Sequence, residues 1–95
     1  MGKEKSRILN EVWFSGRVQG VGFRYETTKI ANGYEVTGYV ENLADGRVHL
    51  VANGTEEEVR QFIEAVCDGL SEYIRDTEIR VGDAKDPFEG FQLKI

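Results

Sequence analysis

A run of nine residues near the N-terminus, Gly16-Arg17-Val18-Gln19-Gly20-Val21-Gly22-Phe23-Arg24, combines three glycines with two arginines. Glycines reach backbone angles that other residues avoid, so successive N–H groups can converge on one anion. A helical pattern follows, and a helix start adds unpaired N–H groups and a partial charge of about +0.5. Arginine adds a planar fork that matches phosphate oxygens in pairs. The run therefore predicts a phosphate-binding cradle.

Two side chains could act on a phosphate in this cradle. Arg24 falls in the first turn of the predicted helix, so its guanidinium can fold back over the loop. Most arginines are ordinary surface residues, but the neighbouring glycines favour phosphate binding here. Asn42 ends a predicted strand, and its amide offers a donor and an acceptor that can orient a water molecule. From position alone, a turn-forming asparagine is the favoured interpretation of that residue.

The other reactive residue types point to packing or to solvent. The glycine run matches neither GxxxxGK[ST] nor GxGxxG, so it predicts neither a nucleoside-triphosphate loop nor a dinucleotide site. His49 lies in an alternating strand pattern, and we expect it to point outward into solvent. Cys67 falls on the apolar stripe of a helix, without a neighbouring histidine or cation that would activate a thiol. No cluster has metal-ligand spacing, so no metal site is expected.

The elements that must position these residues alternate between strand and helix periods. Residues with high strand propensity over 8–15 predict a first strand. After the loop, apolar residues recur at helical spacing through Ala31, and Gly33 is expected to cap that helix. Strands are predicted over 36–42 and 47–53, and the Asp45-Gly46 pair between them predicts a tight hairpin.

The second half of the chain predicts a helix and two further strands. Thr55 and Glu58 have the spacing of a capping box, in which each side chain satisfies the other residue's backbone N–H. The apolar stripe that follows consists of Val59, Phe62, Ile63, Val66, Cys67 and Leu70. Alternation predicts a strand over 77–83, Asp86-Pro87 interrupts the pattern, and a short strand follows from Phe91. The order βαββαβ, with one extra short strand, predicts an α+β sandwich whose mostly antiparallel sheet carries both helices on one face.

Length and composition favour a single soluble domain over residues 1–95, with residues 1–7 as a flexible N-terminus. The net charge of −5 and the pI near 4.9 disfavour nucleic-acid binding, which usually requires a basic surface. No apolar run approaches the ~20 residues of a membrane span, and we expect no hydrophobic signal segment. The single cysteine excludes an internal disulfide. We therefore expect a cytoplasmic monomer that binds a small anion, without a nucleic-acid or membrane partner.

Two separate motifs give the sequence a resemblance to a known family. The segment Gly16-Arg17-Val18-Gln19-Gly20-Val21-Gly22-Phe23-Arg24-Tyr25 resembles the first signature of the acylphosphatase family. The segment Gly38-Tyr39-Val40-Glu41-Asn42, followed by Asp45-Gly46-x-Val48 and Gly54, resembles the second. The resemblance extends from the first strand to Phe91-x-Leu93. It implies a ferredoxin-like sandwich that hydrolyses the carboxyl-phosphate bond of small acyl phosphates to a carboxylate and inorganic phosphate.

The resemblance also assigns roles to residues, and it implies no metal or cofactor. Arg24 would bind the phosphate, and Asn42 would position the attacking water. The cradle would consist of the backbone amides of Gly16, Arg17, Val18, Gln19, Gly20 and Val21. This fits the chemistry, because phosphoryl transfer chiefly requires positioning and charge neutralisation. The leaving carboxylate needs no strong general acid, and a phosphate oxygen of the substrate could accept the proton of the water.

Glu41 departs from the family pattern, in which a basic, amide or small apolar residue is usual at this place. Strand alternation sends it to the opposite sheet face from Asn42, so only a modest effect on substrate affinity is expected. The alternative function is a non-catalytic phosphate-binding or regulatory module on the same fold, since one fold hosts many functions.

Overall fold

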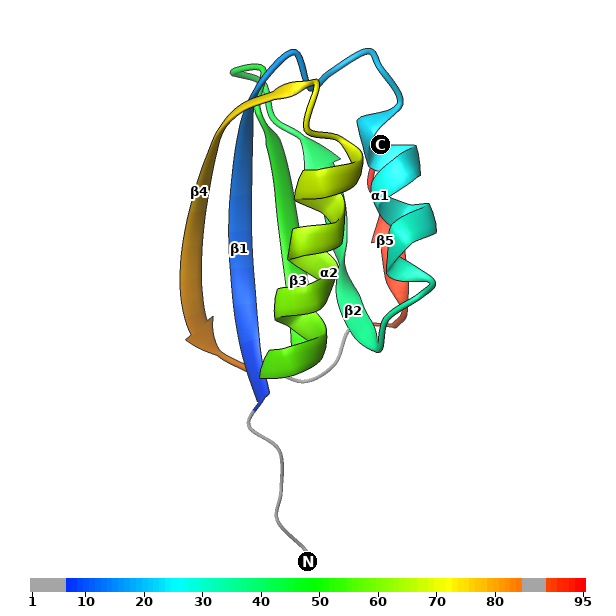
Figure 1. The fold of residues 1–95 in the computed structure, drawn as a ribbon, viewed down its shortest axis with the longest axis vertical. Coiled ribbons are helices and arrows are strands. Elements are labelled where there is room, and N and C mark those ends of the chain that lie inside the picture. The colour runs from blue at the N-terminus through cyan, green and yellow to red at the C-terminus, as the bar shows by residue number, and fades with distance from the viewer. Residues whose placement is uncertain (1–6, 85–88) are drawn as a thin grey trace, which may run out of the picture.

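The computed structural model describes residues 7–84 and 89–95 of the chain, and these form a sheet and two helices (Figure 1). The elements are β1 (Arg7–Gly16), α1 (Phe23–Ala31), β2 (Val36–Asn42), β3 (Val48–Thr55), α2 (Glu56–Gly69), β4 (Ile74–Asp83) and β5 (Phe91–Leu93). Both helices lie on the same face of the sheet, as predicted (Figure 1). Asp86-Pro87 and residues 1–6 of the predicted flexible N-terminus lie outside the described residues, whereas Arg7 begins β1.

The sheet has the strand order β4-β1-β3-β2-β5. The pairs β1–β3, β1–β4 and β2–β3 are antiparallel, while β2 and β5 run parallel. The sheet is therefore mixed, and the predicted α+β ferredoxin-like fold is confirmed. Since β1 and β2 both run antiparallel to β3, they are parallel to each other and end at the same edge. This topology brings the residues after β1 close to the last residue of β2.

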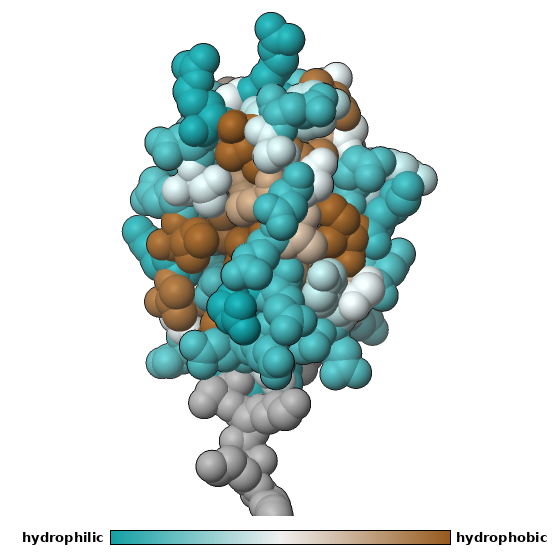
Figure 2. Space-filling view, viewed as in Figure 1, coloured by the Kyte–Doolittle hydropathy of each residue, from teal (hydrophilic) through white to brown (hydrophobic). Residues whose placement is uncertain are grey.

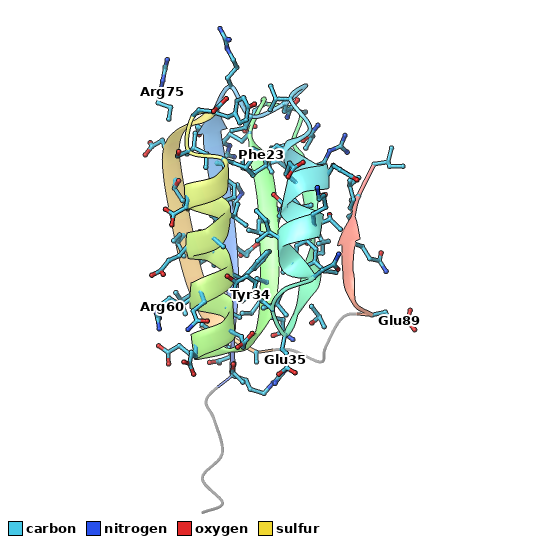
Figure 3. The ribbon with its side chains drawn as sticks, turned by 45° about the vertical axis from the view of Figure 1, so that its right-hand side comes forward. Phe23, Tyr34, Glu35, Arg60, Arg75 and Glu89 are labelled. Atoms are coloured by element: carbon cyan, nitrogen blue, oxygen red, sulfur yellow. The ribbon has the colours of Figure 1, made fainter. Side chains whose placement is uncertain are left out.

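The core lies between the sheet and the helices. Alternate residues of β1, among them Val12 and Phe14, are fully buried on the helix-facing side. Phe14 packs against Phe23 of α1, with ring centroids 5.1 Å apart. Tyr34, which follows α1 and is labelled between the helices in Figure 3, packs against Phe62 of α2 at 6.1 Å. Each buried aromatic ring of this kind contributes roughly 1.5–3 kcal/mol, so α1 is fixed to the sheet at its first residue.

The helix ends differ in detail from the sequence expectation. Thr55 Oγ1 accepts a hydrogen bond from the Glu58 N–H at 3.3 Å, which confirms the predicted N-cap of α2. The Glu58 carboxylate instead accepts from the N–H of Glu35 at 2.8 Å, so it ties α2 to the segment before β2. Gly33 does not cap α1: its φ is not positive, and its N–H bonds the Ile30 carbonyl in a tightened last turn.

Strand β4 forms one edge of the sheet and is longer than predicted. It begins at Ile74, because the turn after α2 leads directly into pairing with the end of β1. Its Ile79 and Val81 remain 49% and 64% exposed. Figure 2 shows hydrophobic side chains along the left margin of the molecule, where β4 lies in Figure 1. This edge is far from the glycine loop except at its first residues.

Candidate active site

The glycine loop, residues 17–22, connects β1 to α1 at the upper edge of the sheet in Figure 1. The hairpin between β2 and β3 lies at the same edge (Figure 1). The parallel directions of β1 and β2 explain this meeting, because both strands deliver their carboxyl ends there. Buried Val18 joins the core cluster and anchors the loop from within. The predicted cradle and Asn42 are therefore neighbours.

A small cavity of about 140 Å³ marks their meeting point. Its lining residues are Val18, Gly20, Gly22, Phe23, Arg24, Tyr25, Asn42 and Leu93. Arg24 and Asn42 thus line one cavity although different elements carry them. Asn42 is exposed to solvent, and Arg24 is half-buried. The structure therefore brings together the two side chains that the sequence singled out.

Gly20 and Gly22 shape the wall of this cavity. Each has a φ of +79°, and a Cβ at either position would meet open space. Glycine is needed there for its backbone conformation, because the left-handed region disfavours side chains. Gly22 is the N-cap of α1, where no side chain caps the helix, and its carbonyl accepts the first helical bond from Glu26. The N–H groups of the first turn therefore lack intrahelical partners and suit an anion.

The beginning of the loop joins β4. This differs from the expectation that the Arg17 amide belongs to the cradle. The N–H of Arg17 donates to the carbonyl of Tyr73 at 2.9 Å, so this amide already has a partner outside the cavity. Gly16 has a φ of +126°, and a Cβ there would lie 2.6 Å from the Tyr73 oxygen. The register of β1 with β4 also shifts between Ser15 and Gly16. Gly16 and Arg17 thus join the loop to β4, and neither lines the cavity.

Gln19 connects the loop to the hairpin. Its side-chain Nε2 donates to the carbonyls of Leu43 at 2.9 Å and of Arg47 at 3.0 Å. From the sequence, only the backbone amide of Gln19 is expected at the site. The signal available in the sequence is a long amide side chain in a glycine-rich loop. It does not identify the hydrogen-bond partners, the carbonyls of Leu43 and Arg47, which lie far along the chain. The two bonds fix the glycine loop relative to the end of β2.

The hairpin itself is stabilised by Asp45. Its carboxylate accepts from the Arg47 backbone N–H at 3.0 Å and from the Arg47 Nε at 2.9 Å. The backbone hydrogen bond is the main cause that lowers the pKa of Asp45, and the guanidinium adds to it. Arg47, whose carbonyl accepts one of the two Gln19 hydrogen bonds, is thus held in place by Asp45 of the same hairpin.

Arg24 reaches across to the residue that directly follows β5. Its Nη1 donates to the carbonyl of Lys94 at 2.6 Å. A guanidinium has five N–H donors, so this bond orients the group and leaves donors for a phosphate. Figure 1 shows the C-terminal end close to the first turn of α1. Residues after β5 therefore take part in placing the cation of the site.

Glu41 and His49 lie on the helix-free face of the sheet. Strand alternation places Glu41 on the opposite face of the sheet from Asn42, as expected. The Glu41 carboxylate lies 2.8 Å from Nδ1 of His49. The expectation that His49 is solvated is wrong, because the residue is only 8% exposed. Trp13 on the same face stacks on the imidazole. The Glu41 carboxylate therefore contacts a partner that lies away from the cavity.

Within residues 7–84 and 89–95, no group of three or more His, Cys, Asp or Glu side chains could bind a metal ion. In the same part of the chain, no helix combines the length and apolarity needed to cross a membrane.

Comparison with known proteins places this arrangement in a family. The acylphosphatase family model matches residues 10–93. The acylphosphatase of Archaeoglobus fulgidus is 39% identical over 87 residues, which cover 90% of this chain and 97% of the relative. The crystal structure of an acylphosphatase from Bacillus subtilis superposes with a TM-score of 0.85 at 31% identity, covering 93% of this chain and 99% of that one. An acylphosphatase from Coxiella burnetii gives 0.83 at 30% identity, over 99% of both chains. With both motifs inside the matched residues, the chain belongs to the acylphosphatase family.

Proposed function

We propose that this protein hydrolyses the carboxyl-phosphate anhydride bond of small acyl phosphates, releasing a carboxylate and inorganic phosphate. The observation that carries this proposal is the cavity that Arg24, Asn42 and the start of α1 line together. Membership of the acylphosphatase family supports the reaction class, a hydrolysis of an acid anhydride. The cavity supplies positive charge and N–H donors but no general base.

Arg24 and the backbone N–H groups would bind the phosphate. The transferred phosphoryl group carries charge on its equatorial oxygens, and fixed donors stabilise that charge without reorganisation. The donors in the proposed cradle are the amides from Val18 to Val21 together with the first turn of α1. Arg17 is left out, because its N–H bonds Tyr73. The bond from Arg24 to the Lys94 carbonyl would keep the guanidinium directed at the cavity.

Asn42 would position the attacking water. Its side-chain oxygen can accept a hydrogen bond from the water, and the amide need not take the proton. The water attacks phosphorus as the bond to the carboxylate oxygen breaks, and the electron pair leaves with the carboxylate. A non-bridging phosphate oxygen receives the proton of the water. Because the carboxylate leaves without protonation, the reaction requires neither a catalytic histidine nor a carboxylate pair.

The test is hydrolysis of benzoyl phosphate by Arg24→Ala and Asn42→Ala. Loss of one donor to a transition state commonly lowers the rate by about 10²–10³, so Arg24→Ala should reduce kcat/KM by this factor. Asn42→Ala should lower kcat and leave inhibition by inorganic phosphate unchanged. Arg60→Ala and Asn32→Ala are matched controls, since both residues lie outside the cavity. Phosphate binding without any turnover would instead identify a non-catalytic module.

We also propose a monomeric, cytoplasmic protein. Its one cysteine, half-buried on α2, has no partner for a disulfide within the chain, as is usual for reducing compartments. Light scattering coupled to size exclusion tests the first statement, and cell fractionation tests the second. A dimer mass or a secreted protein would contradict them.

A further inference from the structure

His49 lies between two carboxylates on the helix-free face of the sheet. Its Nδ1 is 2.8 Å from Glu41 Oε2 on β2, and its Nε2 is 3.1 Å from Glu11 Oε2 on β1. His49 itself is on β3, the strand between them. The imidazole therefore bridges both neighbouring strands through their side chains. We call these three residues the Glu11–His49–Glu41 bridge.

Aromatic rings fix the orientation of the imidazole. Trp13 of β1 stacks on it, with centroids 5.0 Å apart and an interplanar angle of 24°. Tyr39 of β2 meets it edge-on at 6.0 Å. Cations also lie over these rings, since Arg80 is 5.6 Å from the Trp13 centroid and Lys94 is 4.1 Å from that of Tyr39. The ring of His49 has little freedom to leave the two carboxylates.

Each ring nitrogen of the imidazole lies within hydrogen-bond distance of one carboxylate oxygen, and the residue is only 8% exposed. A buried polar group needs such partners, because leaving it without a hydrogen bond is unfavourable. Burial and the carboxylates of Glu41 and Glu11 raise the pKa of Tyr39, so its phenol stays neutral beside them.

The bridge joins the two strands that end at the cavity. β1 leads into the glycine loop, and β2 ends at Asn42. Glu41 directly precedes Asn42, and consecutive strand residues point to opposite faces. Fixing the Glu41 side chain on one face therefore fixes the peptide unit that aims Asn42 on the other face.

We propose that His49 is a positioning residue that sets the orientation of Asn42 through Glu41. This rests on the proposed role of Asn42 in aligning the attacking water. His49 and the substrate lie on opposite faces of the sheet, so the effect passes through the strand. Misplacement of a reacting group by about 1 Å can lower a rate by about 100-fold, and a loosened strand end should lower kcat by about 10-fold.

The kinetic test uses His49→Phe, which keeps the aromatic stack and removes both ring nitrogens. We expect kcat to fall about 10-fold while KM and phosphate inhibition stay unchanged, because Asn42 aligns water and does not bind the phosphate alone. Glu41→Gln keeps an acceptor without charge and should give an intermediate kcat. Glu78→Gln is the matched control: it removes an exposed carboxylate from β4 and should leave kcat unchanged.

A double mutant separates positioning from general destabilisation. In an Asn42→Ala background, His49→Phe should cause no further loss of kcat, because the residue on which it acts is absent. An equal loss in both backgrounds would overturn the proposal. So would a fall in Tm with unchanged kcat at a temperature where the variant is folded, since the bridge would then be purely structural.

A spectroscopic readout keeps the test independent of turnover. The side-chain amide resonances of Asn42 should shift in His49→Phe and Glu41→Gln but not in Glu78→Gln. Unchanged Asn42 resonances in His49→Phe would refute the positioning role whatever the activity. Shifted resonances in a protein without hydrolysis would support the bridge and refute the proposed function.

Discussion

Gln19→Ala tests whether the glycine loop depends on the hairpin for its position. Gln19 donates two hydrogen bonds, to the Leu43 carbonyl at 2.9 Å and to the Arg47 carbonyl at 3.0 Å. Each such bond contributes about 0.5–1.5 kcal/mol, so the pair amounts to about 1–3 kcal/mol. Since about 1.4 kcal/mol corresponds to tenfold, the equilibrium between ordered and displaced loop should shift by ~5- to ~150-fold.

The expected effect on binding falls in the lower part of this range. Val18 is fully buried and still anchors the loop after Gln19 is shortened. A reduced fraction of competent loop raises apparent dissociation constants in proportion, so KM and the inhibition constant of phosphate should rise by about 5- to 20-fold. The change in kcat should be smaller, because Arg24 keeps its bond to the Lys94 carbonyl. Gln19→Glu should be worse, since its carboxylate would face two carbonyl oxygens.

The assay is hydrolysis of benzoyl phosphate with inorganic phosphate as the competing ligand, together with Tm. Gln92→Ala is the matched control, because the Gln92 side chain also bonds a carbonyl, that of Glu89 at 3.2 Å, but Gln92 itself is exposed. Wild-type KM and phosphate inhibition in Gln19→Ala, measured where it is folded, would show that the loop is positioned without the hairpin. The reasoning from the two bonds would then be wrong.

Gly16→Ala should lower the free energy of unfolding by about 1–3 kcal/mol, because Gly16 has a left-handed backbone conformation. The 2.6 Å approach of the new Cβ to the Tyr73 carbonyl oxygen should lower it further. Gly33→Ala should be neutral, and urea denaturation of both variants measures the difference. The folded protein lowers the pKa of Asp45, so its carboxylate contributes to folding stability. That contribution is complete above the ordinary pKa of about 3.9 and is lost as the pH falls through the lowered pKa. Acid unfolding of Asp45→Asn should therefore lack this part of the transition, and an identical acid profile would contradict it. Burial and nearby carboxylates raise the pKa of Cys67, so an aromatic disulfide reagent at neutral pH should modify it more slowly than a free cysteine, and equal rates would refute the assignment.

Periodicity and turn residues predicted the fold because each depends on neighbours in the chain. The apolar stripe of α2 and the Thr55 cap are local, and both are present. The partner of Glu58 is not local: the carboxylate meets the Glu35 N–H, which the order of elements brings beside α2 (Figure 3). Gly33 shows the same limit, since the last turn of α1 tightens and continues into Tyr34 without a left-handed residue.

For the site, motif spacing singled out Arg24 and Asn42, and the cavity unites them. It could not reveal that the Arg17 amide bonds Tyr73, because that contact depends on how β4 begins. His49 illustrates a further limit. Strand alternation predicts which face of the sheet His49 lies on. It does not predict that Trp13 of β1 stacks on the imidazole there, because the register between β1 and β3 decides which side chains meet.

The bond between Arg24 and the Lys94 carbonyl spans 70 residues of sequence. Contacts between such distant residues close long loops, so they form late when local structure forms early. β5 pairs with β2 at the edge of the sheet opposite to β4. A refolding chain could therefore complete both helices and the central strands before the Lys94 carbonyl orients the Arg24 guanidinium. Recovery of turnover during refolding would then follow the docking of β5, and it should lag behind the burial of the single tryptophan, Trp13.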